Sequence, residues 1–486
     1  MGNRFEMIKH GIFTFLLGVL LPAGLWAQDY HAIEGSPFAG SMGVANNPAS
    51  ILSTPYPWDI TVLSLQLKNS TNVLTITNFS LINPSDSSKY FFTEGNHTRY
   101  FNFNFNLHLL NARIALNRRQ AVAFGANLKS YGIGSSSRFN YLDTLHNPNQ
   151  FFRINNDNLP FSANVVSSSW LELFATYSQT LRDDEYGRLN AGITLKAMRG
   201  LSGALAQLTG GSVQNSIVNR KPVYSLNGGT ARYGYSSNYD SWRNSRSTGE
   251  NVNDFFAQSL GGLALDLGAE YYIKSQAIKS YDEDDYFDYE WKIGVSLLDI
   301  GQNQYKYGTQ SLSLSNPKII TDSILNMKFG GHLPTLAKIN DSLRTIVNST
   351  NQLQGIFKIR NPARFVINVD RPLGNGFSVN ANLSVNLTGS NSGKILSVQE
   401  MNLLNLTPRW ETKRWGAYLP IQYTTEGRLM IGGAFKAGPL LLGIHNWGNV
   451  FSGDKMQNGG GYIALVIRPG NGFREKEDKR YSCPKL

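Results

Sequence analysis

Residues 99–110 read RYFNFNFNLHLL, and this alternation limits the possible folds more than any other feature of the chain. Apolar side chains at odd positions, from Phe101 to Leu109, alternate with polar ones at even positions, from Asn102 to His108. Successive side chains of a strand point to opposite faces, so this segment predicts a strand with one apolar face and one amide-rich face. Such a strand is typical of a membrane barrel with a polar lumen. A soluble β-sandwich could also contain one.

The alternation recurs along the chain, and the connections support the membrane alternative. Every second connection is short, as at 117–119, 372–375 and 437–438, whereas others are as long as 201–258 and 302–360. Outer-membrane barrels have short periplasmic turns and longer extracellular loops. We therefore predict an all-β chain forming a transmembrane antiparallel barrel of about 14 strands. The expected strands are 58–81, 99–116, 120–133, 168–181, 188–200, 259–276, 288–301, 361–371, 376–388, 405–411, 415–424, 428–436, 439–446 and 460–468.

The ends of the chain predict its location and its division into segments. Residues 1–27 have a basic start and an apolar run from Gly11 to Leu21, which is typical of a cleaved signal peptide; the alternative is a membrane anchor, for which the run is short. We expect residues 28–57 to plug the lumen, residues 58–468 to form the barrel in the outer membrane of a Gram-negative bacterium, and residues 469–486 to form a periplasmic tail. Cys483 is the only cysteine, so an intramolecular disulfide is excluded.

Composition argues against nucleic-acid binding and the motifs argue against catalysis. The net charge is +11, but the basic residues are dispersed, and charged residues make up only 16% of the chain. His108 and His445 lie within expected strands without persuasive catalytic partners, and we expect His445 near the extracellular rim. The acidic run 282–285 lacks the ligand spacing of a calcium loop. We predict no enzyme activity, no cofactor and no metal site.

Several motifs resemble the FadL-like outer-membrane superfamily. Asn47, Pro48 and Ala49 precede the first strand, as the Asn-Pro-Ala segment does in that superfamily. The runs GLALDLGAEYY (262–272) and KIGVSLLDIG (292–301) resemble its Asp-Leu-Gly strands, and 416–447 resembles an uncharacterised bacterial branch. The resemblance implies a fourteen-stranded barrel with an N-terminal plug. It leaves function open, because the superfamily includes both hydrophobic-compound transporters and PorV-type accessory proteins of secretion.

The predicted inward face is polar, and this bears on the choice between those functions. Extending the alternation places amides and charged groups in the lumen, namely Asn102, Asn104, Asn106, His108, Lys129, Glu172, Lys196, Asp266, Glu270, Asn380 and Asn382. A passage for fatty acids would need an apolar lining, whereas these groups could bind one another and the plug. We also expect a salt bridge between Glu172 and Lys196.

We therefore expect a plugged, non-enzymatic structural or accessory subunit of an outer-membrane or secretion complex. The alternative is a passive channel or FadL-like transporter of small or hydrophobic substrates. The expected surroundings are outer-membrane lipid, including lipopolysaccharide, and a possible protein partner. The sequence names neither that partner nor a substrate.

Overall fold

A computed structural model describes residues 32–77, 89–144, 148–156, 159–274, 289–318, 320–329, 335–389, 395–448 and 456–469. The proposed signal peptide, most of the proposed tail and the acidic run 282–285 lie outside these residues. The described residues are predominantly β-structure. None of the helices in these ranges is long and apolar enough to cross a membrane.

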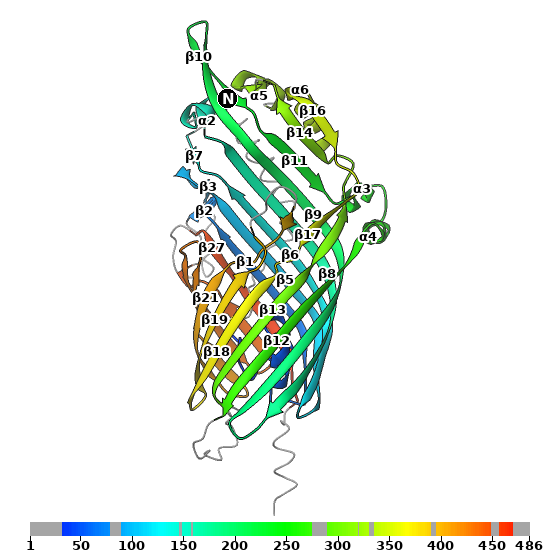
Figure 1. Ribbon diagram of the computed structural model, residues 1–486, viewed down its shortest axis with the longest axis vertical. Helices are drawn as coiled ribbons and strands as arrows, with labels where there is room; N and C mark the ends of the chain where they lie inside the picture. Colours follow the sequence, from blue (N-terminus) through cyan, green and yellow to red (C-terminus); the bar gives the residue numbers. More distant parts are fainter. Residues whose placement is uncertain are drawn as a thin grey trace, which may run out of the picture.

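The strands form one closed antiparallel barrel of 14 strands, which confirms the predicted fold class (Figure 1). β1 pairs with β5 on one side and with β27 on the other, so the wall has no open edge. In order around the wall, the strands are β1 (Trp58–Thr71), β5 (Tyr100–Asn117), β6 (Gln120–Ser136), β8 (Phe161–Asp183), β9 (Gly187–Val218), β12 (Leu260–Lys274), β13 (Tyr289–Lys306), β18 (Arg364–Gly374), β19 (Phe377–Asn386), β21 (Leu403–Glu411), β22 (Trp415–Tyr418) with β23 (Ile421–Thr424), β25 (Gly433–Ala437) with β24 (Leu429–Ile431), β26 (Leu440–Ile444) and β27 (Asn458–Ile467).

Two of these fourteen strands are interrupted, one at a proline and the other at a glycine, and both residue types weaken a strand. Pro420 separates β22 from β23, and it has no N–H to give to the sheet. Gly432 separates β24 from β25, and its N–H donates to the Pro420 carbonyl at 2.8 Å. β22 and β23 both pair with β21 on one side, and on the other side they pair with β25 and β24 respectively, so each pair counts as one strand of the wall.

The barrel wall has an apolar outer face and a polar inner face. On β5, Phe101, Phe103 and Phe105 are partly exposed on the outside, whereas Asn104 and Asn106 are buried. A closed barrel of this kind satisfies every backbone group within the wall and presents hydrocarbon outward, which is the arrangement a lipid bilayer requires. The protein is an outer-membrane barrel.

Long connections gather at one end of the barrel, as the sequence predicts, but they contain more structure than expected. Strands β8 and β9 continue beyond the predicted ranges, and β9 runs on to Val218. These long connections also contain β2 (Leu74–Thr77), β3 (Lys89–Phe92), β4 (Gly95–His97), β7 (Phe139–Tyr141), α2 (Pro148–Ile154), β10 (Lys221–Asn227), β11 (Thr230–Tyr235), α3 (Asn238–Ser241), α4 (Thr248–Ala257), β14 (Leu312–Pro317), β15 (Ile320–Thr321), α5 (Asp322–Phe329), α6 (Leu336–Ile346), β16 (Val347–Gln352), β17 (Ile356–Arg360) and β20 (Leu396–Ser397).

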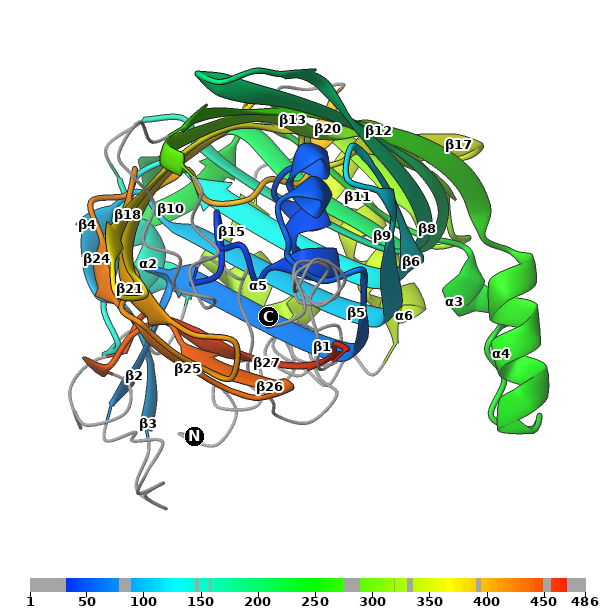
Figure 2. The same ribbon diagram turned by 90° about the horizontal axis from the view of Figure 1, so that it is seen from below.

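Residues 32–57, here called the luminal segment, lie inside the barrel (Figure 2), in its lower part as drawn in Figure 1. The segment forms two short 3-10 helices, η1 (Gly40–Ala45) and η2 (Pro48–Leu52). Its apolar side chains Phe38, Met42 and Ile51 are buried. It reaches β1 at the end of the barrel where the short turns lie, because Trp58 pairs with Ile114 near the β5–β6 turn.

Candidate functional site

The inside of the barrel is the candidate site, and its lower half is occupied by the luminal segment. The Asn47–Pro48–Ala49 motif is the point of closest fit. The Asn47 side-chain oxygen accepts the Ala49 N–H at 2.9 Å, and its amide donates to the carbonyl of Ala269 at 3.0 Å. Ser178 donates its hydroxyl hydrogen to the Pro48 carbonyl at 2.7 Å. The Asn47 amide also lies 3.3 Å from the Val295 carbonyl of β13. This one motif therefore joins η2 to three strands, β8, β12 and β13.

Two glycines on adjacent strands make room for this motif. A Cβ at Gly192 of β9 would lie 2.6 Å from the Ala49 nitrogen. At Gly268 of β12 a Cβ would lie 2.8 Å from Pro48 Cδ and closer still to the Asn47 side-chain oxygen. These separations are below the 3.0 Å that real Cβ atoms essentially never cross. The Asp-Leu-Gly run and the Asn-Pro-Ala motif, which are far apart in the sequence, thus contact each other.

Cationic side chains of the wall bind backbone carbonyls of the luminal segment. Arg113 donates to the carbonyls of Ile51 and Tyr56 at 2.5 and 2.7 Å. Arg409 donates to the carbonyls of Glu34 and Gly35 at 2.6 and 3.1 Å. Irregular buried backbone needs partners for its carbonyl groups, and these guanidinium groups supply them. Lys292, Arg364 and Arg468 make the same kind of contact, to Gly35, Ala45 and Phe38.

A network of buried charges crosses the interior above the luminal segment. Lys129 lies 3.2 Å from both Glu172 and Asp299, and Lys196 lies 2.7 Å from Asp266 and 2.6 Å from Asp299. All five residues are buried. Shared ion pairs and hydrogen bonds compensate the cost of removing these charges from water.

The predicted salt bridge between Glu172 and Lys196 is wrong, although both groups belong to this network. Glu172 pairs across the sheet with Met198, and Lys196 pairs with Phe174. The prediction placed the centre of the β8–β9 hairpin one residue too early. Strand pairing continues to Asp183 and Arg188, and an irregularity between Thr180 and Arg182 shifts the register.

The other predicted luminal residues are placed as follows. Asn104, Asn106, His108, Glu270, Asn380 and Asn382 are buried, and Asn102 is partly buried. Glu270 accepts a hydrogen bond from Ser53 of the luminal segment at 2.7 Å. Asn380 donates to Asp370 at 3.0 Å. His445 directly follows the last residue of β26, where the connection to β27 begins, and its side chain is buried beside Tyr462 because it shares the inward phase of Leu441.

Cavities between the luminal segment and the wall are small. One of about 20 Å³ is bordered by Glu34, Asn46, Asn382 and neighbouring residues, and a second of about 10 Å³ also borders Asn382. Volumes of this size hold about one water molecule. The amide of Asn382 has no hydrogen-bonding partner among the described residues. These two cavities therefore have space for isolated water and for nothing larger.

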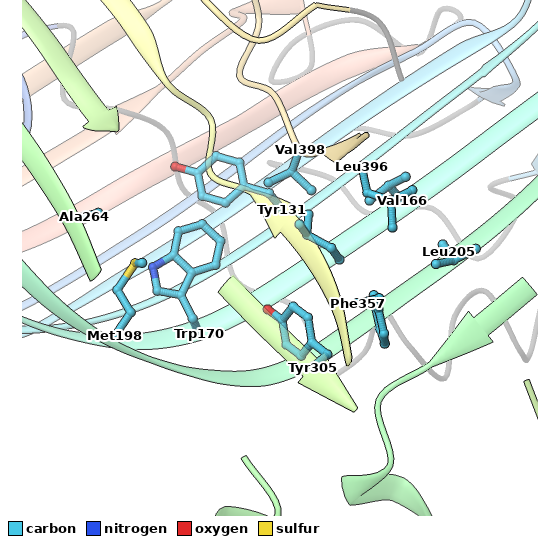
Figure 3. Packing of buried hydrophobic residues seen from close by; sticks show 11 residues of the cluster. Tyr131, Val166, Trp170, Met198, Leu205, Ala264, Tyr305, Phe357, Leu396 and Val398 are labelled. Carbon is cyan, nitrogen blue, oxygen red and sulfur yellow. The ribbon is translucent and has the colours of Figure 1, made fainter. Parts of the chain in front are cut away.

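Above the charged network, the inner wall changes from polar to apolar. An aromatic cluster joins Tyr131, Trp170 and Tyr305 to aliphatic neighbours from several strands (Figure 3). The rings of Tyr131 and Trp170 stack at 5.4 Å. The indole N–H of Trp170 donates to Glu172 at 3.1 Å, so the cluster directly adjoins the charged network.

A loop among the long connections packs against this aromatic cluster. Residues 395–401, here called the inward loop, place Leu396 and Val398 in contact with the cluster (Figure 3). The inward loop is held by Asn102, which donates to the Gln399 carbonyl at 3.3 Å, and by an ion pair between Arg364 and Glu400. Arg364 also donates to the Ala45 carbonyl at 3.1 Å. One guanidinium group therefore contacts both the inward loop and the luminal segment.

Sequence reasoning missed the aromatic cluster, although the signal was present. The inward phase that includes Lys129 continues to Tyr131, and the phase that includes Glu172 leads back to Trp170. The inward position of residues 395–401 has no such signal, since it depends on a loop folding back over a distant wall. No group of three or more His, Cys, Asp or Glu suited to a metal ion occurs within the described ranges.

Comparisons with known proteins place the chain in a family and give weaker structural likenesses. A family model described as "Family of unknown function (DUF5723)" matches residues 48–444. No curated protein matches. Similar solved structures include the toluene transporter TbuX of Ralstonia pickettii, at 11% identity, TM-score 0.37, covering 92% of this chain and 95% of that one. A FadL homologue of Pseudomonas aeruginosa has 11% identity, TM-score 0.37 and coverages of 92% and 98%. A mutant of the monoaromatic hydrocarbon channel TodX has 10% identity, TM-score 0.40 and coverages of 88% and 94%.

Proposed function

The chain belongs to the DUF5723 family of unknown function, and we propose that it is a transport barrel for small hydrophobic molecules, closed in the state described here. The aromatic cluster carries this proposal. An outer-membrane barrel can fill its interior with polar side chains alone, as the lower half of this one does. Ligand sites are mostly apolar surfaces with a few polar groups, and the cluster combines apolar side chains with the tyrosine hydroxyls, the Trp170 indole and Glu172.

Transport through this barrel would require two displacements. The inward loop would leave the aromatic cluster to admit a molecule from outside. The luminal segment would then move from the Gly192–Gly268 cradle to release the molecule toward the periplasm. The luminal segment is not a strand of the wall, and the inward loop joins the sheet only through the two residues of β20, which pair with β17. Either segment could therefore move while the fourteen-stranded wall stays closed. Arg364, which contacts both segments, would link the two movements.

Uptake of a fluorescent hydrophobic probe by intact cells tests this function. N-phenyl-1-naphthylamine fluoresces when it passes an outer membrane, so the uptake rate can be compared between cells with and without the protein. We expect faster uptake with the wild type and a several-fold smaller gain with Trp170→Ala, which removes the largest ring of the cluster. Equal uptake by wild-type cells and cells lacking the protein would contradict transport of such molecules.

One observation favours a second candidate, a structural or accessory subunit of an outer-membrane complex. The luminal segment is fixed by many buried contacts, and two cavities beside it measure only about 20 and 10 Å³. A permanently closed barrel could serve as a membrane platform for a partner protein. Co-purification of one stoichiometric partner, together with absent probe uptake, would favour this candidate. In either case we propose that the barrel acts without catalysing a reaction.

A further inference from the structure

The connection between β11 and β12 forms an excursion on the outside of the barrel. Residues 236–259, here called the α3–α4 excursion, contain both helices, and α4 projects from the outer wall beside β8 and β9 (Figures 1 and 2). It therefore lies on the lipid side of the wall rather than over the barrel mouth.

Specific contacts fix the α3–α4 excursion to the wall. Asn238 donates to the Leu201 carbonyl at 2.8 Å, and Arg199 donates to the Phe256 carbonyl at 3.1 Å. Ser247 and Glu250 form a capping box at the start of α4. The buried Asn251 accepts the Arg243 N–H at 2.9 Å. Rigid attachment means that the outward side chains of the excursion keep one orientation.

Among the exposed side chains of the excursion, most of which are polar, four are large and apolar. Tyr239 and Trp242 are each 48% exposed, Val252 is 41% exposed and Phe256 is 39% exposed. Val252 and Phe256 are four residues apart on α4, so they share one face of the helix. A rigid group of large exposed apolar side chains marks a surface that contacts something other than water.

The height of the α3–α4 excursion on the wall identifies that surface. Arg199 is on the outer face of β9, and the lipid-facing Leu195 lies four residues below it, about 13 Å along the strand. Leu263 of β12 is 77% exposed and pairs with Ala197 between them. Leu195 and Leu263 belong to the band of lipid-facing apolar side chains around the barrel, here called the apolar belt. The excursion therefore begins directly above the apolar belt, at the level where headgroups meet acyl chains.

The neighbouring strands lack aromatic residues at this level. At the opposite end of the belt, Tyr177, Tyr186 and Tyr271 are exposed on β8, the β8–β9 turn and β12. At the upper end, the outward residues of β8, β9 and β12 are Ser167, Ser169, Leu171, Ala197, Arg199 and Gly261. Membrane barrels carry aromatic girdles at both interfaces. On this side of the barrel, the described strands supply only the lower one.

We propose that the α3–α4 excursion inserts Tyr239, Trp242, Val252 and Phe256 into the outer-leaflet interface, and so completes the upper girdle with a helix in place of strand residues. The partner is the lipid itself, at the boundary between headgroups and acyl chains. Short amphipathic segments with aromatic and aliphatic faces bind at this depth. This inference is independent of the transport proposal.

Depth-dependent fluorescence quenching tests the insertion. The native cysteine is removed by Cys483→Ser, and an environment-sensitive dye is attached to Val252→Cys in the full-length protein. The labelled protein is reconstituted into phosphatidylcholine vesicles brominated either near the headgroup or deep in the acyl chain. Leu263→Cys is the control within the belt. Ile217→Cys is the matched control in water, because Ile217 is 80% exposed and lies 18 residues beyond Arg199 on β9, about 60 Å along the strand.

We expect the Val252 dye to be quenched at least about twofold more by shallow bromines than the Ile217 dye, and the Leu263 dye to be quenched most by deep bromines. Migration of unboiled protein in SDS gels verifies that each variant is folded. If the dyes at positions 252 and 217 show the same low quenching in folded protein, the excursion stands in water and the inference is wrong. Strongest quenching of the Val252 dye by deep bromines would also overturn it, since the helix would then lie within the acyl chains.

Discussion

The fit between Gly268 and Asn47 allows the seating of the luminal segment to be perturbed by one methyl group. Gly268→Ala would bring a Cβ too close to both the Asn47 side-chain oxygen and Pro48 Cδ. Overpacking of this kind costs about 1–3 kcal/mol. The seated segment bears this cost and the displaced segment avoids it. A shift of about 2 kcal/mol raises the displaced fraction about thirtyfold.

The assay is the alkylation rate of a cysteine that is protected when the segment is seated. Met42 is 1% exposed, so Met42→Cys in a Cys483→Ser background reacts with a maleimide only when the segment leaves its seat. For a free-energy shift of about 2 kcal/mol, we expect Gly268→Ala to accelerate labelling about thirtyfold. Gly261→Ala is the matched control, because a Cβ at this position on the same strand meets only one atom, at 3.9 Å. It should leave the rate unchanged.

A double variant separates the proposed clash from a general loss of stability. Asn47→Ala alone should accelerate labelling, since it removes three hydrogen bonds that hold the segment. The double variant Asn47→Ala/Gly268→Ala should accelerate labelling by less than the product of the two single accelerations, because the effects of substitutions at residues in contact are not additive in free energy. Equal labelling rates for Gly268→Ala and Gly261→Ala would refute the reasoning, as would exact multiplication of the single effects.

Three further predictions concern the wall, the charged network and the inward loop. Leu107→Arg should lower the free energy of unfolding by about 2–4 kcal/mol in a urea titration in lipid, whereas Leu107→Met should change it little. Equal losses for the two variants would show that this face does not contact hydrocarbon. Lys129→Met should lower the free energy of unfolding by about 3–5 kcal/mol, because it leaves Glu172 and Asp299 short of a partner. Adding Glu172→Gln should recover part of this loss, and no recovery in the same titration would contradict the network. Arg364→Gln removes the ion pair to Glu400, so protease cleavage within the inward loop should be faster than in the control variant Arg360→Gln, which changes an exposed residue nearby. Identical cleavage rates in the two variants would show that Arg364 does not hold the loop.

Local patterns in the sequence predict the wall well and the interior only in part. The alternation from Phe101 to His108 fixes which side chains face outward, since side-chain direction in a strand has a strict period of two. Strand ends are less predictable. β9 continues to Val218 because it pairs with β10 and β11 beyond the membrane, and such pairing is a long-range effect.

The candidate site shows the same division. Burial of Lys129, Glu172 and Lys196 follows from strand phase, but their partners depend on register, which a single irregularity near Thr180 changes. The lumen is also less polar than the sequence predicts. Tyr131 and Trp170 lie in the same inward phase as the charged residues, and the apolar surface they form becomes apparent only when several strands are placed side by side.

The central claim is that the luminal segment and the inward loop close this outer-membrane barrel, and a planar bilayer tests it most directly. Purified full-length protein should insert without a steady open-pore conductance, because the cavities beside the luminal segment hold about one water molecule each. Gly268→Ala combined with Arg364→Gln should produce transient openings. A large, stable conductance from the wild type, like that of an open porin, would contradict the account.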